Sequence, residues 1–80
     1  MKKTVQFIDE DQLRNKISQN IRTEIDLSGK SKSDIAKAIG VSKPTLSQYL
    51  SGKVQPSLIT LSRLCNYLEI SADDILEIKK

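Results

Sequence analysis

The chain has 80 residues, of which 38% are hydrophobic and 29% charged, a balance that favours one small folded domain over a disordered segment. Its single cysteine excludes an internal disulfide, and the absence of histidine excludes zinc fingers and catalytic sites built on a Ser-His or Cys-His pair. The net charge is +3, and no apolar run approaches the roughly 20 residues of a membrane span. No hydrophobic segment follows the first three residues, so no signal peptide is indicated and we expect a cytoplasmic protein.

The sequence has no pattern that indicates catalysis or cofactor binding. Its three glycines stand alone at positions 29, 40 and 52, so there is no glycine-rich phosphate loop. Asp73 and Asp74 form a carboxylate pair, but they suit the first turn of a helix, where the helix dipole favours negative charge. We therefore expect no enzyme activity, no metal site and no cofactor.

Positive charge is concentrated in the middle of the chain. Residues 1–29 hold five basic and five acidic side chains, and residues 54–80 hold three basic and four acidic ones. Residues 30–53 hold five lysines against one aspartate, which leaves a net charge of +4. This charge fits a solvated lysine-rich face and a contact surface for nucleic acid equally well.

The folded domain is predicted at residues 9–80. Residues 1–8 are mostly polar with two alternating apolar side chains, a pattern that fits either a loose arm or a short strand. The first helix is expected to begin after Asp9, with Gln12 completing a capping box, and to end near Ser28 before a glycine with left-handed backbone. A four-residue repeat predicts its buried face, which consists of Leu13, Ile17, Ile21 and Ile25.

Two short helices are expected in residues 31–52. Ser31 caps the first of them and Gly40 ends it. Only Val41 separates this glycine from Ser42, which caps the next helix, and a proline in the first turn of that helix costs no hydrogen bond. A second glycine, at position 52, ends it. The apolar side chains of the two helices are Ile35 and Ile39, then Leu46, Tyr49 and Leu50.

Two further helices complete the domain. Pro56 and Ser57 begin one of them, and Ser71 with Asp74 caps the last. With short turns between five helices and no convincing strand after residue 8, we predict an all-α, compact five-helix bundle. The buried residues expected in the fourth helix are Leu58, Leu61, Leu64, Cys65 and Leu68, with the cysteine as core filling.

The helix pair in residues 31–52 differs from a general helical hairpin. Almost no loop separates the two helices, so they must cross at a steep angle, and Ala36 and Gly40 are small enough for a close approach. This arrangement is typical of a helix-turn-helix motif, whose second helix can lie in the major groove of DNA.

Residues 31–70 closely resemble the phage repressor and Cro family of helix-turn-helix DNA-binding proteins, also called the Xre family. The residues that carry the resemblance are SKSDIAKAIGVSKPTLSQYLSGK, the Pro-Ser start of the following helix, and LSRLCNYLEIS. The resemblance implies a lambda-repressor-like bundle of five helices that binds double-stranded operator DNA, usually as a symmetric dimer. We therefore expect a transcriptional regulator, and more specifically a repressor.

The resemblance also implies roles for individual residues. Base contacts are implied for the helix at residues 43–51, where Gln48 can pair with adenine and Lys43 can donate to guanine. Two positions depart from the family pattern, because Lys32 replaces a common glutamine and Leu50 a common glutamate. The implied base-contacting residues are Lys43, Pro44, Ser47 and Gln48, and the implied phosphate-contacting residues are Lys32, Thr45 and Lys53.

One recognition helix reads only a few base pairs, so specific binding usually needs a second copy of the domain. We expect a homodimer joined through residues 72–80, where Ile75, Leu76 and Ile78 are more apolar than a terminal turn requires. Pairing of the amino-terminal TVQF across the dimer axis is the second choice.

Two other functions are compatible with the same bundle. A protein-interaction module, or an antitoxin-type regulator, would use it to bind a protein partner in place of DNA. The net charge of +4 in residues 30–53 favours DNA, because a module converted to protein binding has no need of that charge.

Overall fold

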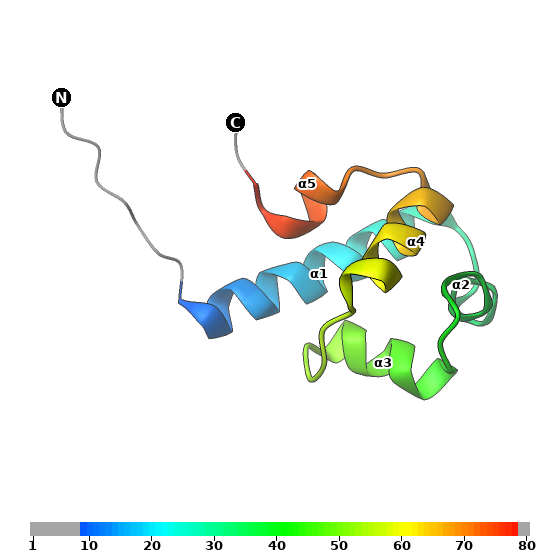
Figure 1. Ribbon diagram of the computed structural model, residues 1–80, viewed down its shortest axis with the longest axis horizontal. Coiled ribbons are helices and arrows are strands. Elements are labelled where there is room, and N and C mark those ends of the chain that lie inside the picture. Colours follow the sequence, from blue (N-terminus) through cyan, green and yellow to red (C-terminus); the bar gives the residue numbers. More distant parts are fainter. Residues whose placement is uncertain (1–8, 79–80) are drawn as a thin grey trace, which may run out of the picture.

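A computed structural model describes residues 9–78, which form five α-helices with no strand among them (Figure 1). This confirms the all-α prediction, while the expected arm at residues 1–8 lies outside the described part of the chain. Over residues 9–78, no helix combines the length and the apolar character that crossing a bilayer requires. The helices are α1 (Glu10–Ser28), α2 (Lys32–Ile39), α3 (Lys43–Ser51), α4 (Leu58–Leu68) and α5 (Ala72–Leu76).

Each helix begins at a side-chain cap that the sequence predicts. The carboxylate of Asp9 accepts hydrogen bonds from the second and third backbone N–H groups of α1, at 3.1 and 3.3 Å. Serine hydroxyls cap the other four helices in the same way, and so satisfy N–H groups that have no partner within the helix. The detail differs at α5, where Ser71 accepts from the N–H of Asp73 and not from that of Asp74.

The helices end in two different ways. The first three end at Gly29, Gly40 and Gly52, with φ angles of 72°, 78° and 81°. This confirms the left-handed exit predicted at Gly29 and the helix ends predicted at the other two glycines. α4 and α5 end at Glu69 and Glu77, with φ angles of 58° and 62°. A side chain makes left-handed backbone less favourable, so the surrounding structure holds these two glutamates in that conformation.

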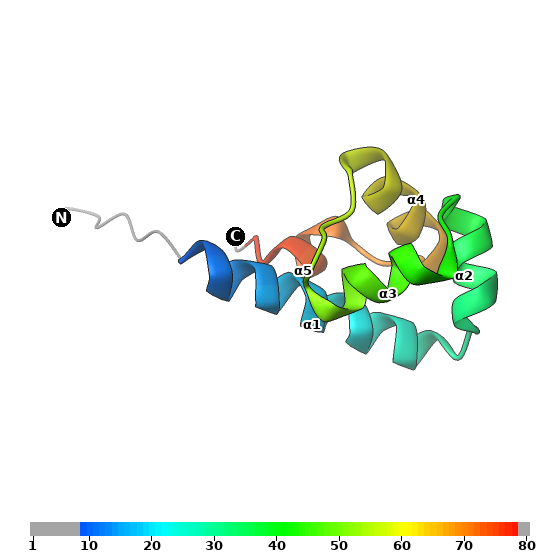
Figure 2. The same ribbon diagram turned by 90° about the horizontal axis from the view of Figure 1, so that it is seen from below.

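The core forms where α3 packs on α1 and α2 packs on α4, while α5 closes over α1 and α4 (Figures 1 and 2). Four residues predicted in the core are not fully buried: Leu58 is 82% exposed, Leu13 is half-buried, and Ile17 and Leu68 are half-buried and packed against the core. Leu58 is the first residue of α4, and a helical side chain points toward the amino-terminal end, where no preceding turn covers it. The buried apolar residues are Ile21, Ile25, Ile35, Ala36, Ile39, Leu46, Tyr49, Leu50, Leu61, Leu64, Cys65 and Ile75.

Gly52 is required by a close approach as well as by its backbone angle. A Cβ atom at this position would lie 3.2 Å from the hydroxyl oxygen of Ser18 and 3.5 Å from the amide oxygen of Asn15, both on α1. Gly40 differs, because an added Cβ would meet only the flexible guanidinium of Arg63 on α4. The expectation that Gly40 is small because α2 and α3 cross is therefore wrong, and its left-handed backbone is the reason for the glycine.

We predict that Gly52→Ala lowers the free energy of unfolding more than Gly29→Ala does. Both changes force alanine into a left-handed conformation, which costs about 1–2 kcal/mol. Only the change at Gly52 also pushes Ser18 away, whereas nothing lies within 4 Å of the Cβ added at Gly29. Denaturant titration should give an additional loss of about 1 kcal/mol for Gly52→Ala. Equal losses would contradict the close packing of α3 on α1.

Candidate nucleic-acid interface

The two sides of α3 differ in chemistry. Leu46, Tyr49 and Leu50 are buried against the rest of the bundle. The side chains between them point outward, because residues one and two positions away from a buried helical residue lie on other faces. All four predicted base-contacting residues are exposed on that outward side, namely Lys43, Pro44, Ser47 and Gln48.

The outward side of α3 lies on the molecular surface and carries unused hydrogen-bonding groups. In Figure 2, which views the bundle from below, α3 crosses the middle of the face. Among residues 9–78, no hydrogen bond engages the side chains of Ser47 or Gln48. The backbone carbonyl of Gln48 is used internally, since it accepts from the N–H groups of Lys53 and Val54. The side-chain amide therefore remains available to a ligand.

Two of the three predicted phosphate-contacting residues lie at the ends of α3, and the third lies at the start of α2. Lys32 is the first residue of α2, Thr45 lies in the first turn of α3, and Lys53 follows its last turn. The hydroxyl of Thr45 is half-buried and accepts a hydrogen bond of 2.9 Å from Ser42. α3 has nine residues and is about 13 Å long, close to the width of the DNA major groove, about 12 Å. The exposed cations Lys43 and Lys53 stand at its two ends.

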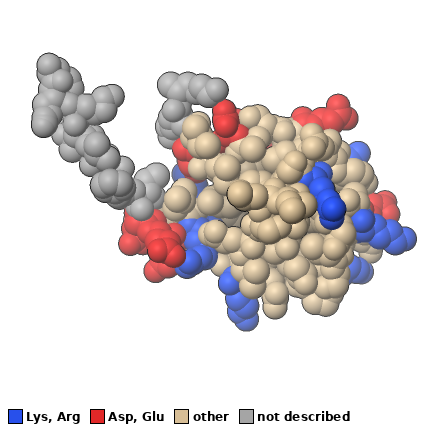
Figure 3. All heavy atoms as spheres, in the orientation of Figure 1, with Lys and Arg blue, Asp and Glu red and all other residues tan. Residues whose placement is uncertain are grey.

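Not every basic side chain near this surface is available to an anion. Lys30 places its ammonium 5.2 Å from the ring centre of Tyr67, so it is directed at α4. Arg14, near the start of α1, is paired with Glu10 at 3.0 Å and with Asp11 at 2.9 Å. In Figure 3, basic atoms lie along the lower edge, on the right-hand side and near the middle of the face, while acidic atoms gather at the start of α1 and along the upper edge, with one further group on the right.

Two residues that the sequence analysis missed hold α3 in place. A guanidinium nitrogen of Arg22, on α1, donates to the backbone carbonyl of Leu50 in the last turn of α3. Ser18, also on α1, is 4% exposed and lies under Gly52. Neither residue has a local sequence signal, because both act on atoms about 30 positions away in the chain. Leu50 itself fills the core, so the apolar residue at this position has a packing role of its own.

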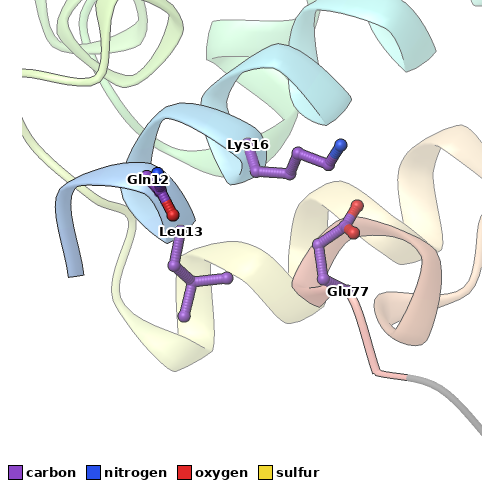
Figure 4. Close-up of a pocket in the computed structure, with 4 residues that line it drawn as sticks. All are labelled: Gln12, Leu13, Lys16 and Glu77. Carbon is purple, nitrogen blue, oxygen red and sulfur yellow. The ribbon is translucent and has the colours of Figure 1, made fainter. Parts of the chain in front are cut away.

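A shallow pocket is present away from α3, between the first turns of α1 and the end of α5. It is lined by Gln12, Leu13, Lys16 and Glu77, and the charged ends of Lys16 and Glu77 point toward one another across it (Figure 4). Its charged groups are one cation and one anion, and Gln12 adds a neutral amide. It therefore lacks the concentration of positive charge that a phosphate backbone requires.

The structure corrects one of the residues predicted for the dimer contact. Ile75 has no exposed surface and belongs to the core, so it cannot meet a second subunit without unfolding of α5. Leu76 is half-buried, and Ile78 is 51% exposed. α5 is held by the side-chain amide of Asn20, which donates to the carbonyl of Ile75 at 3.1 Å and to the carboxylate of Glu77 at 2.7 Å.

Comparison with solved structures finds the same arrangement of helices in other proteins. The chain is 32% identical to the SOS-response transcriptional repressor LexA from Eubacterium rectale, with a TM-score of 0.79 over 91% of this chain and 78% of that one. A hypothetical transcription factor, NHTF from Neisseria, is 20% identical, with a TM-score of 0.73 over 91% of this chain and 84% of that one. At this lower identity the second likeness concerns the fold alone. No curated protein matches the chain.

A helix-turn-helix family model matches residues 21–75, which include α2, α3, α4 and most of α5. The match covers more than half of the chain and contains every described residue of the outward side of α3. The chain therefore belongs to the helix-turn-helix family of phage-repressor and Cro-like DNA-binding regulators.

Proposed function

We propose that the protein is a sequence-specific repressor that binds duplex DNA and inserts α3 into the major groove. The observation that carries the proposal is the outward side of α3, where Ser47 and Gln48 have free hydrogen-bonding groups between two exposed lysines. The opposite side of the same helix is buried, so these groups are presented by a rigid element. The assignment as a repressor, as distinct from an activator, is supported by the similarity to the LexA repressor.

Base recognition is assigned to four residues of α3. The side-chain amide of Gln48 can pair with adenine when its nitrogen donates to N7 and its oxygen accepts from the N6 amino group. The ammonium of Lys43 can donate to O6 and N7 of guanine. Ser47 offers a hydroxyl to either kind of base, and the ring of Pro44 offers an apolar contact to a thymine methyl group.

Phosphate contacts are assigned to Lys32 at the start of α2, Thr45 in the first turn of α3, and Lys53 just after its last turn. The two lysines are exposed and carry the charge that displaces counterions from DNA. The Thr45 hydroxyl accepts a hydrogen bond from Ser42, and its own proton remains free to be donated to a phosphate oxygen. Such contacts fix the orientation of α3 without reading the sequence.

The DNA site is proposed to be a palindrome bound by two copies of the chain. α3 exposes only four residues suited to base contact, which is enough for a few base pairs. Two half-sites about 10 base pairs apart would place two copies on the same side of the duplex.

The experiment that tests this function is selection of bound sequences from a random duplex library. We expect an enriched palindrome with half-sites about 10 base pairs apart from centre to centre. Recovery of sequences without any common motif would contradict sequence-specific binding. Failure to retain duplex DNA at any salt concentration would favour a protein partner for the same bundle.

We predict that Lys53→Ala flattens the salt dependence of DNA binding for every sequence. Loss of one phosphate contact should change the slope of log K against log salt by about 0.9. The matched control is Lys16→Ala, which removes the same charge from an exposed residue beside Glu77, away from α3 (Figure 4). Titrations at several salt concentrations measure both slopes. Equal slopes for the two variants would show that Lys53 makes no phosphate contact.

We predict a different result for Gln48→Ala. A base contact carries sequence information, so binding to the selected palindrome should weaken by about 1–3 kcal/mol while binding to random duplex changes little. The salt slope should stay unchanged, because the substitution removes no charge. Competition titrations with both duplexes provide the measurement, and a uniform loss on specific and random DNA would contradict the base contact.

A further inference from the structure

One apolar side chain of α1 remains partly uncovered at the edge of the bundle. Leu13 belongs to the four-residue repeat of that helix, but it is only half-buried, whereas Ile21 and Ile25 lie in the core. In Figure 1 the first turns of α1 extend beyond α3 and α4, and the end of α5 lies beside them. Leu13 therefore borders the pocket between α1 and Glu77 (Figure 4). This pocket has a volume of about 400 Å³, which is in the range of sites for small organic molecules and accommodates an aromatic ring.

A second hollow adjoins this pocket and is acidic. It has a volume of about 290 Å³, is lined by Asp73, Asp74, Glu77 and Ile78, and shares Glu77 with the first pocket. Ile78 is 51% exposed, so each hollow includes an apolar side chain. Residues 69–78 contain four acidic side chains and no basic one. The two hollows, which we call the α1–α5 groove, therefore favour a segment that is both apolar and positively charged.

The residues that precede α1 have this composition. Residues 1–8, with the sequence MKKTVQFI, lie outside the described part of the chain, and they contain no acidic side chain. Their apolar residues stand next to α1 in the sequence, and their two lysines stand further from it. The groove has the same order, because Leu13 is in the first turns of α1 and the acidic hollow lies toward α5. Hydrophobicity and charge therefore match along the segment. The residues concerned are Lys2, Lys3, Val5, Phe7 and Ile8.

The cap of α1 directs the preceding residues toward the groove. Asp9 is the N-cap, so Ile8 stands immediately before the cap and Leu13 is the fourth residue of the helix. Apolar residues at these two positions commonly pack against each other and fix the direction from which the chain enters a helix. Contact between Ile8 and Leu13 brings the chain in over the groove, because Leu13 is part of its wall. From Ile8 to Lys3 an extended chain spans roughly 16 Å, which is comparable with two hollows of this size in line.

We propose that residues 2–8 bind in the α1–α5 groove of their own chain. The ring of Phe7 occupies the pocket beside Leu13, and the ammonium of Lys3 faces the carboxylate of the exposed residue Asp74. The segment begins beside the groove, so its effective concentration there is high. A second copy of the segment therefore does not compete for the groove at ordinary protein concentrations.

The bound segment holds α5 in place. α5 has five residues and places Ile75 in the core, and the amide of Asn20 donates to two of its backbone carbonyls and to the carboxylate of Glu77. Short elements with few contacts open locally before the rest of a fold. A segment packed on α1 and α5 together opposes this opening. It also keeps its lysines on the side of the bundle away from α3, so they take no part in DNA contact (Figure 1).

Nuclear Overhauser effects locate the segment directly. Phe7 is the only phenylalanine of the chain, so its ring gives one set of phenylalanine signals. We expect cross-peaks between this ring and the methyl groups of Leu13 in the full chain. A mixture of isotope-labelled and unlabelled chains separates contacts within one chain from contacts between two copies. Absence of these cross-peaks would overturn the proposal. Cross-peaks only between two copies would overturn it as well, in favour of pairing of TVQF across a dimer axis.

Hydrogen exchange tests whether the segment holds α5. The variant is Phe7→Ala, and its matched control is Leu27→Ala, which removes a side chain that is 75% exposed on α1 outside the groove. The reporters are the backbone N–H groups of Glu77 and Ile78, both of which donate to the carbonyl of Asp73. We expect Phe7→Ala to speed their exchange at least about tenfold, the control to change it less than about twofold, and exchange in α4 to stay the same. Unchanged exchange at the end of α5, or an equal increase in α4, would contradict the proposal.

The salt dependence of DNA binding tests where the lysines of the segment lie. In the double variant Lys2→Ala with Lys3→Ala we expect the slope of log K against log salt to stay as it is in the unmodified chain. A change in slope of about 0.9 for each lysine would place the segment on the duplex and overturn the proposal. If the chain binds no duplex, the proposed function fails, and the Overhauser and exchange measurements still decide whether the segment occupies the groove.

Discussion

The carboxyl end of α3 is fixed to the middle of α1, and the presentation of the whole recognition surface depends on that attachment. The left-handed backbone of Gly52 allows the chain to turn while it lies against Ser18. One turn further along α1, Arg22 donates to the carbonyl of Leu50, an acceptor that the end of a helix leaves without a partner. Its positive charge also meets the negative end of the α3 dipole. Steric fit and electrostatics therefore hold the same end of the helix.

The opposite end of α3 is fixed by a different device. Gly40 and Val41 close α2 with N–H groups that donate to the carbonyls of Lys37 and Ala36, and the Ser42 hydroxyl caps α3 immediately afterwards. The turn between the two helices has almost no freedom as a result. A helix fixed at both ends keeps its outward side chains in defined positions, which lowers the entropy lost when they bind.

Three surfaces of the bundle differ in physical character. The outward side of α3 is polar with exposed lysines, the exposed side chains of Val54, Leu58 and Ile59 are apolar, and the end of α5 is acidic. A polyanion is attracted to the first and repelled by the third.

Much of the fold was predictable from local pattern. The capping residues, the three left-handed glycines and the apolar repeats each act within a few positions of the chain, so they indicate five helices before any packing is known. The exits of α4 and α5 at Glu69 and Glu77 were not predictable, because tertiary packing holds a conformation that their own sequence does not favour. The same holds for Leu58, whose apolar character indicated the core although no neighbouring turn covers it.

Part of the candidate site was likewise predictable from local pattern, and part was not. The exposed residues of α3 follow from helical periodicity and from the resemblance to a known family, since a helix with one buried side must present the other. Ile75, which was expected at the subunit contact, lies in the core, and Leu58, which was expected in the core, lies on the surface. Burial depends on which elements lie next to each residue. Arg22 and Ser18 became visible only in the fold, where α1 meets the end of α3.

By itself the sequence determined which residues form each helix and which side of α3 is polar, because those depend on local backbone preference and spacing. Tertiary structure decided what holds α3 in place and which apolar residues remain uncovered, because both depend on contacts between residues far apart in the chain.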